Sequence, residues 1–199
     1  LNALTTVGVG ALTTTEIGAL STLQMKAINT TNIAALSSTQ IAALTGPQLG
    51  ALSALQLGHL DSTDVSVLST TQIAALTATQ FANLNTTAAS SLSVTQIGAL
   101  TGTQLRALTT GQIVNLSTTT IGALTTTAIT GLTAVQVGAF TTTQILVLSP
   151  NDLSVLSTGQ IRGLKTSQIS VLTTTQIQGL TTTELAGLVQ TQVAGITTT

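Results

Sequence analysis

Hydrophobic and polar positions along this chain follow a fixed period of eight residues. One repeat reads Leu68-Ser-Thr-Thr-Gln-Ile-Ala-Ala-Leu76. The pattern continues without insertion or deletion from Ala3 to Ala194, which is 24 consecutive octads, and a partial octad follows it. A fixed short period is typical of repeat architectures, in which the chain lengthens by adding units. We therefore expect residues 1–199 to form a single uninterrupted repeat domain.

The octad, aligned as Ala-Leu-Thr-Thr-Thr-Gln-Ile-Gly, has two large apolar columns. The second column is Leu in nearly every octad, with Ile28 and Phe140 as replacements. The seventh is Ile, Val, Leu, Met25 or Phe81, and Ala89 is its one small exception. The first and eighth columns are mostly Ala, Gly, Ser or Val. These four columns adjoin across the repeat boundary, so they predict that each octad turns Leu and Ile toward a common interior.

The third column predicts a helix start in every octad. Apart from Lys165 and Val189, it contains only Ser, Thr, Asn and Asp, whose side-chain oxygens accept a hydrogen bond from free N–H groups at a helix N-terminus. Three residues later most octads have Gln or Glu, which completes a capping box, and the flanking Leu and Ile form a hydrophobic staple. Pro150 at N1 and Pro47 at N2 fit the first turn of a helix.

Each octad is predicted to form its own short helix. A continuous helix fits poorly, because eight residues exceed two turns (~7.2 residues) and the apolar stripe would rotate around the axis. We expect one helix of about five or six residues per octad, a bend at the Leu–Thr junction, and stabilisation by neighbours, because isolated short helices are unstable. The fold class is thus all-α, a tight α-solenoid of two-turn helices. The spacing does not fix how many octads make one superhelical turn.

A Thr-rich β-solenoid is the alternative fold. Thr, Ile and Val favour strands. The spacing of five and three residues between the apolar columns, however, places Leu and Ile on opposite faces of a straight strand. Asn and Asp in the third column also disfavour strands.

Charge and composition exclude several classes of function. Four Lys and Arg stand against five Asp and Glu, which is too few cations for a nucleic-acid surface or a polybasic membrane patch. No apolar run approaches the ~18–20 residues of a membrane span. The chain has no Cys, Trp or Tyr and only two Phe, so it has no disulfide and few aromatic anchors for binding. No signal peptide is evident.

The ends of the sequence fall within the repeat pattern. The chain begins Leu1-Asn2 without a methionine and ends in mid-pattern at Thr199. We expect it to be a processed product or part of a longer array.

Few residues suggest chemistry. His59, the one histidine, lies near Asp61 and Asp64, which is a possible metal-ligand cluster. The stronger interpretation is that Asp61 is an N-cap and Asp64 an N3 residue, both favoured by the helix dipole. Nothing pairs His59 with a nucleophile. We therefore predict no catalytic, metal or cofactor-binding residues and no cofactor.

The remaining acidic residues and the glycines follow the repeat. Glu16, Glu184 and Asp152 all occupy the capping-box column, so we interpret them as caps and not as an acid/base pair. The glycines follow the octad and no phosphate-loop motif, and close packing explains them better: Gly8, Gly10, Gly18, Gly50 and Gly58.

The Thr columns are the one extended chemical surface. If octads stack, the Thr side chains form hydroxyl ladders. These ladders are either a solvated polar edge or a surface for self-association or for contact with carbohydrate, mineral or ice. Sequons for N-glycosylation begin at Asn29, Asn85 and Asn115, and chance matches are expected in so Thr-rich a chain.

The run from Leu68 to Phe81 resembles the Leu-Thr-x-x-Gln-Ile-x-x-Leu octapeptide arrays of large bacterial secreted or surface proteins. The resemblance covers essentially the whole chain. It implies an extracellular, structural or adhesive context without an enzymatic site. Lys165 and Val189 depart from the cap column, so we expect a less regular solenoid near the C-terminal end.

The predicted function is a non-enzymatic structural protein that forms an extracellular or cell-surface rod, filament or sheath by stacking. Its first and last full octads are as apolar as the others, which favours end-to-end or lateral self-association. The alternative is an adhesin or an ice-binding or other surface-binding rod that uses the Thr ladders. We expect no nucleic-acid partner and no membrane span.

Overall fold

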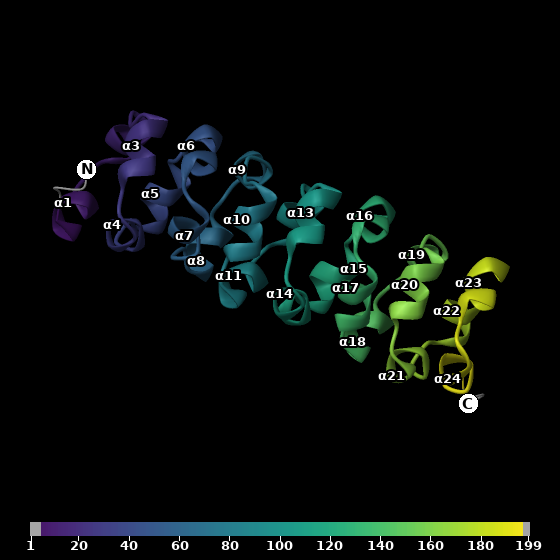
Figure 1. Ribbon diagram of the computed structural model, residues 1–199. Coiled ribbons are helices and arrows are strands. Elements are labelled where there is room, and N and C mark those ends of the chain that lie inside the picture. The colour runs from purple at the N-terminus through teal and green to yellow at the C-terminus, as the bar shows by residue number, and fades with distance from the viewer. Residues whose placement is uncertain (1–4, 197–199) are drawn as a thin grey trace. The chain divides into compact units, whose positions relative to one another are not determined.

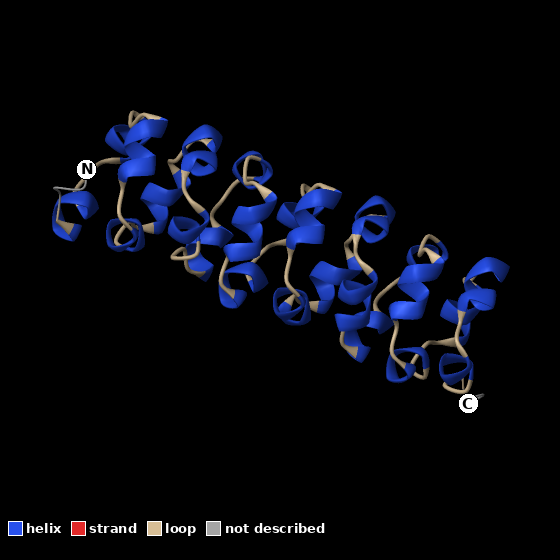
Figure 2. Cartoon of the chain, viewed as in Figure 1, coloured by secondary structure: helices blue, strands red, loops and turns tan. Residues whose placement is uncertain are grey.

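The computed structural model describes residues 5–196, which form one short helix in each octad. Those residues contain 24 helices of four to six residues and no strand (Figures 1 and 2). The prediction of an all-α solenoid with one helix per octad is therefore confirmed. The β-solenoid alternative is wrong for this part of the chain.

The chain divides into two compact units, residues 1–100 and residues 101–199. The helices of unit 1 are α1 (Thr6–Gly10), α2 (Thr14–Gly18), α3 (Thr22–Ala27), α4 (Thr30–Ala34), α5 (Ser38–Ala42), α6 (Gly46–Ala51), α7 (Ala54–Leu57), α8 (Ser62–Ser66), α9 (Thr70–Ala74), α10 (Ala78–Asn83), α11 (Thr86–Ser90) and α12 (Val94–Gly98). The helices of unit 2 are α13 (Gly102–Ala107), α14 (Thr110–Asn115), α15 (Thr118–Gly122), α16 (Thr126–Gly131), α17 (Ala134–Ala139), α18 (Thr142–Leu146), α19 (Pro150–Ser154), α20 (Thr158–Gly163), α21 (Thr166–Ile169), α22 (Thr174–Gln178), α23 (Thr182–Gly187) and α24 (Gln190–Val193).

The third-column residue begins each helix as predicted. At α22, Thr173 has extended backbone angles (φ −70°, ψ 158°) and its hydroxyl accepts a hydrogen bond from the Gln176 N–H. The Gln176 Oε1 accepts in return from the Thr173 N–H, at 3.0 Å. Pro150 lies at N1 of α19 and Pro47 at N2 of α6. Only Lys165 and Val189, among the described helices, give no side-chain cap, and these are the two predicted departures.

Each helix ends without a left-handed residue. No residue in the described range has a positive φ. The chain instead closes with a tighter bond, such as Leu52 N–H to Leu49 O at 3.1 Å, and Leu52 then returns to extended angles (φ −64°, ψ 144°). The same leucine therefore ends one helix and precedes the N-cap of the next, which is the bend expected at the Leu–Thr junction.

Three octads make one turn in each unit. Every helix contacts the third helix after it within the same unit, for example α1 with α4 and α4 with α7 in unit 1, and α14 with α17 and α17 with α20 in unit 2. The helices of each unit therefore form three stacks, and each stack gains one helix per turn. Figure 1 shows the helices in chain order and labels most of them. The spacing of apolar residues within one octad does not determine the number of octads per turn.

The two large apolar columns form the core of each unit. In unit 1, Ile33, Ile41 and Ile73 are fully buried, and Leu36 and Leu44 are 5 % and 2 % exposed. The staple pair thus meets inside the solenoid. The second residue of each helix faces outward even when it is apolar, because four such residues are 69–80 % exposed: Val7, Leu23, Leu55 and Val135.

The core tolerates a change of size within one turn. Phe81 of α10 and Ala89 of α11 occupy the seventh column of neighbouring octads, and both are fully buried. Phe81 is larger and Ala89 is smaller than the isoleucine usual in this column, and both still lie in the core.

Some glycines lie where successive turns approach closely. A Cβ at Gly58 would lie 2.9 Å from Asn83 O, and one at Gly50 would lie 3.2 Å from Ala75 O. At Gly10 and Gly18 the nearest oxygens would be 3.9 and 3.7 Å away, which is ordinary contact. Gly8 lies inside α1. Close packing therefore explains Gly58 and Gly50 but not Gly10 and Gly18.

Helix α20 offers a matched test of this packing. A Cβ at Gly163 would press on the Ala134 carbonyl oxygen and lie 2.9 Å from its carbonyl carbon, whereas a Cβ at Gly159 would meet only the Ser157 Oγ at 3.9 Å. We expect Gly163→Ala to lower the free energy of unfolding by about 1–3 kcal/mol through overpacking. Gly159→Ala should raise it by up to about 1 kcal/mol through helix propensity. Urea denaturation of both variants checks this, and equal effects would contradict the packing.

Candidate functional site

The sixth-column glutamine uses both ends of its side chain. The Oε1 of Gln136 accepts hydrogen bonds from the Thr133 N–H at 2.9 Å and the Thr133 hydroxyl at 3.1 Å. Its Nε2 donates to the carbonyls of Leu105 at 2.9 Å and Leu108 at 2.7 Å, in the turn before. Gln136 is 3 % exposed. One buried side chain therefore caps its own helix and bonds to the backbone of the preceding turn.

We call this repeated contact the glutamine seam. It joins a helix-to-helix corner to the corner one turn earlier, and it recurs through both units. The Nε2 atoms that donate to the carbonyl 28 residues earlier belong to Gln40, Gln48, Gln56, Gln72, Gln80, Gln96, Gln136, Gln144, Gln160, Gln168, Gln176 and Gln192. In the described residues no buried side-chain nitrogen or oxygen is left without a partner.

Helix α11 keeps the seam by a different residue. Its sixth column holds Ala88, which has no side-chain donor. The N-cap Asn85 instead donates from Nδ2 to Leu60 O at 2.8 Å, while its Oδ1 accepts from the Ala88 N–H at 2.8 Å. Leu60 is the residue whose carbonyl a glutamine in place of Ala88 would reach, so the same carbonyl receives a donor. The hydrogen bond to the preceding turn can thus come from the sixth-column residue or from the N-cap residue.

Three acidic residues keep the cap but supply no amide hydrogen. Asp64, Asp152 and Glu184 are 8 %, 7 % and 3 % exposed and accept the N-cap N–H at 3.1, 2.8 and 2.6 Å. An ionised carboxylate only accepts hydrogen bonds. At these helices the capping box is retained without the bond to the preceding turn.

The sequence predicted the capping role of the glutamines and missed the seam. A capping box needs only a side-chain acceptor at N3, which Glu supplies as well as Gln. The strong preference for Gln over Glu in this column was the available signal, since only the amide adds a donor.

The candidate metal cluster does not assemble. His59 is exposed, after the end of α7. Asp61 is the N-cap of α8 and Asp64 its N3 residue, and each carboxylate accepts the other's backbone N–H, at 2.9 and 3.1 Å. No group of three metal-ligating side chains occurs among residues 5–196. The cap interpretation of both aspartates is therefore what the structure shows.

The other candidates also take helix-terminal positions. Glu16, Asp152 and Glu184 are the N3 residues of α2, α19 and α23. Asn29 and Asn85 are N-caps whose Oδ1 accepts a backbone N–H at 2.8 Å. The three sequon asparagines, with Asn115 as the third, are exposed.

Exposed hydroxyls form ladders along single stacks. In unit 1, the second residue of α2, α5, α8 and α11 is Thr15, Thr39, Thr63 and Thr87, and all four are exposed. These helices contact one another in order. In unit 2, a ladder on α15, α18, α21 and α24 consists of Thr119, Thr143, Ser167 and Thr191, also exposed. The hydroxyl faces expected from stacking are therefore present.

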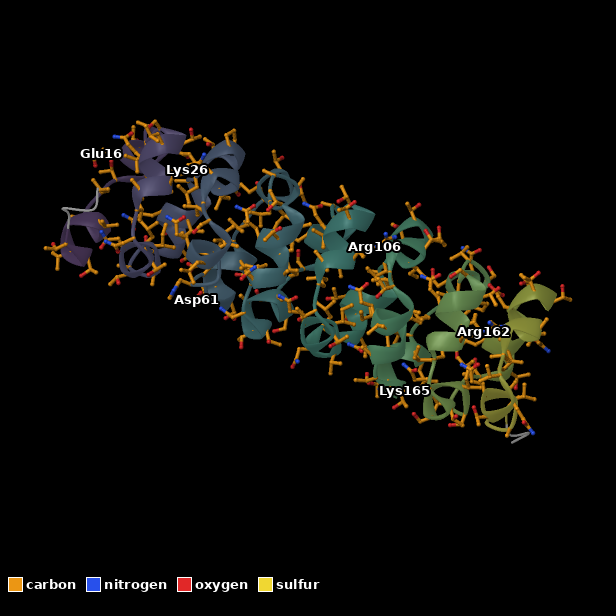
Figure 3. The ribbon with its side chains drawn as sticks, in the orientation of Figure 1. Glu16, Lys26, Asp61, Arg106, Arg162 and Lys165 are labelled. Atoms are coloured by element: carbon orange, nitrogen blue, oxygen red, sulfur yellow. The ribbon has the colours of Figure 1, made fainter. Side chains whose placement is uncertain are left out.

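Charged side chains are sparse on this surface. Glu16, Lys26 and Asp61 lie apart from one another in unit 1, as do Arg106, Arg162 and Lys165 in unit 2 (Figure 3). The two arginines donate from Nε to the carbonyls of Gly131 and Gly187, at 3.1 and 3.0 Å. No helix between residues 5 and 196 has more than six residues, so none is long enough to cross a membrane.

The repeat itself is similar to a known family. Residues 22–54 and 147–182 match the ALTTAQ repeat. One stretch lies in each unit. In one-letter residue code, ALTTAQ agrees with the first six octad columns except at the fifth, where Thr is the most common residue in this chain. No curated protein matches the chain. The chain is thus a repeat protein with a regular helical architecture, similar to the ALTTAQ repeat over those two stretches.

The seam predicts a large stability cost for removing an internal glutamine. Gln144 is 2 % exposed, accepts from Thr141 N–H and donates to Leu116 O. Gln144→Met keeps the length of the side chain but removes both polar atoms. We expect the free energy of unfolding to fall by about 2–4 kcal/mol, because buried polar groups lose their partners. Chemical denaturation measures this change.

Gln24 supplies the matched control. It accepts from Ser21 N–H at 2.8 Å, as in every capping box, but it is exposed in the first turn of unit 1. Gln24→Met should cost less than about 1 kcal/mol. An equal loss in both variants would show that capping, and not the bond between turns, carries the stability.

The buried Asp64 predicts a dependence on pH. Burial raises the pKa of this carboxyl above its ordinary value, the hydrogen bond from Asp61 N–H opposes the rise, and the Asp61 charge adds to it. The native state then binds more protons than the unfolded state above about pH 4, so this group makes stability fall as pH rises through its native pKa. Asp64→Asn should remove that fall and be more stable than wild type at neutral pH. Unfolding free energies measured from pH 3 to 8 check this.

Glu16 should make stability depend on pH in the opposite direction to Asp64. The Thr13 N–H and hydroxyl, each 2.8 Å from its Oε2, lower the pKa of Glu16. Its stabilising contribution is therefore present above its unfolded pKa and is lost as pH falls through its native pKa. The difference between Glu16→Gln and wild type should shrink on acidification. The same trend in both variants would contradict the environments described.

Proposed function

We propose that this repeat protein is a non-enzymatic structural protein that forms a rod, filament or sheath by stacking of solenoid turns. The observation that supports the proposal is the direction of the contact between turns. Each turn presents glutamine amides and apolar side chains to the turn before it. It presents backbone carbonyls and seventh-column side chains to the turn after it.

The last described turn has the seventh column uncovered. Leu185 and Val193 are 40 % and 52 % exposed, whereas their counterparts one turn earlier, Ile161 and Ile169, are at most 2 % exposed. The following turn is what buries this column. A further turn, from the same chain or from a second copy, would bury the same side chains.

The first turn of unit 1 carries the complementary groups. Glu16 and Gln24 are exposed there, whereas the N3 glutamines of later turns are buried. Gln24 is the equivalent of Gln48 one turn earlier. The Gln48 Nε2 donates to the carbonyls of Ile17 at 2.9 Å and Leu20 at 2.7 Å, so the Gln24 amide is placed to donate to a preceding turn in the same way. Faces that are complementary and not self-complementary give head-to-tail growth, which extends without closing unless a ring forms.

The outward surface supports a second candidate, an adhesin or a rod that binds ice, carbohydrate or another surface. The specific observation is the threonine ladder Thr15, Thr39, Thr63 and Thr87, which presents one hydroxyl in each turn of unit 1. A Thr39→Lys and Thr63→Lys double variant should abolish inhibition of ice recrystallisation or binding to polysaccharide. No effect of the wild-type chain in either assay would remove this candidate.

The proposal includes an extracellular or cell-surface location and no enzymatic activity. The resemblance to secreted repeat arrays supports the location. The use of the polar side chains Ser, Thr, Gln, Asp and Glu in caps and seams supports a structural role, because these groups are engaged in holding the helices.

Electron microscopy and light scattering of the purified chain test stacking. We expect filaments whose length grows with concentration. A Leu185→Lys and Val193→Lys variant should remain monomeric, because charges would be placed on the face that the next copy must bury. Leu55→Lys, at a side chain that is 69 % exposed on the outward face, is the matched control and should still assemble.

Two results would contradict head-to-tail stacking. One is a strictly monomeric wild-type chain at high concentration. The other is filament formation that the end-face variant leaves unchanged while Leu55→Lys abolishes it, which would indicate lateral association.

A further inference from the structure

A shallow apolar depression lies on the outward face of unit 2. Its volume is about 480 Å³, and it is formed by α14 and α17, with Lys165 at its edge. Val114 and Val135 flank it and are 42 % and 71 % exposed. A volume of a few hundred cubic ångströms lined mostly by apolar groups is within the range of sites for small molecules.

Departures from the repeat create this depression. The second helical residue, Thr in most octads, is Gly111 in α14 and Val135 in α17. Gly111 removes a side chain from the outward face, and Val135 adds an apolar one beside it. The buried Gly138, the small Ala139 and the polar Thr110 and Asn115 complete the lining. In unit 1, the stack at the same place in the three-octad period has Thr15, Thr39, Thr63 and Thr87 at the second position instead.

Lys165 gives the depression a positive charge. It replaces the Ser or Thr that would cap α21, and its side chain makes no cap bond. Losing such a cap costs about 0.5–2 kcal/mol. Lys165 is exposed, and it is the one charged residue among those that line the depression in the described chain. Positions that break a local rule at a cost to stability are where function is expected.

We propose that this depression binds a medium-chain fatty acid, with the carboxylate at Lys165 and the alkyl chain against Val114, Val135 and Ala139. The depression matches a fatty acid in both charge and polarity. The lining offers one cation and no acidic group, and its apolar side chains are exposed to water when the depression is empty. Burying them against an alkyl chain is favourable in proportion to the area covered. The proposal is independent of stacking, because Val114, Val135 and Lys165 are exposed on the outward face and not on the faces between turns.

Titration with sodium decanoate below its micelle concentration tests the site, with binding followed by calorimetry and by the NMR signals of the valine methyl groups. We expect saturable binding of one decanoate, with the largest shifts at Val114 and Val135. Lys165→Gln should weaken binding about tenfold, as should Val135→Thr, which restores the usual residue of that column. Circular dichroism should show both variants folded.

Matched controls separate this site from general surface adsorption. Lys26→Gln removes an exposed cation of unit 1, and Val94→Thr removes a valine there that is 40 % exposed. Both should bind decanoate as the wild type does. Decanol should bind about tenfold more weakly than decanoate. The proposal would be overturned by absent or non-saturable binding, by equal affinity for decanol, or by equal losses in the control variants.

Discussion

The side-chain amide of the sixth-column glutamine holds the turns of each unit together. Its oxygen closes the capping box of one helix, and its nitrogen bonds to a carbonyl of the preceding turn, as in Gln136 with Thr133 and Leu108. A helix of four to six residues has too few internal hydrogen bonds to be stable alone. The same contact therefore starts the helix and supplies the neighbour that stabilises it. Because the amide is buried, the geometry of both hydrogen bonds, the one to its oxygen and the one from its nitrogen, is strongly constrained.

This constraint explains which changes the chain accepts. Asn85 replaces the lost glutamine of α11 by donating from the cap position to Leu60 O. The seventh column accepts both Phe81 and Ala89, each fully buried. Asp64 and Glu184 keep the cap without the donor, and burial raises the pKa of Asp64. Outward positions are less constrained, which is why Thr, Gly, Val and Leu all occur there and why a hydroxyl ladder and an apolar depression can form on the same scaffold.

Local features of the fold were predictable from the sequence, and the closure of the turn was not. The cap column, the glutamine three residues on and the Leu–Ile pair predicted one helix per octad, because capping and staple contacts lie within a single octad. The number of octads per turn depends on contacts between successive turns, which the period of a single octad leaves undetermined. The seam was missed for the same reason. The depression at Lys165 was visible only as a departure from the cap column, and Gly111 and Val135 gained meaning once α14 and α17 were known to be neighbours.

Cross-linking tests the three-octad turn most directly, since the natural chain has no cysteine. A Cβ at Gly46 of α6 would lie 3.1 Å from the Cβ of Ala75, the C-cap of α9, a few tenths of an ångström below the Cβ–Cβ distance of about 3.5–4.5 Å in disulfides. Gly46→Cys with Ala75→Cys should oxidise rapidly to an intramolecular disulfide. Gly46→Cys paired with Val67→Cys or Asn83→Cys, one octad nearer or farther, should not. A disulfide at either of those positions in place of the first would contradict the turn of three octads and the glutamine seam that depends on it.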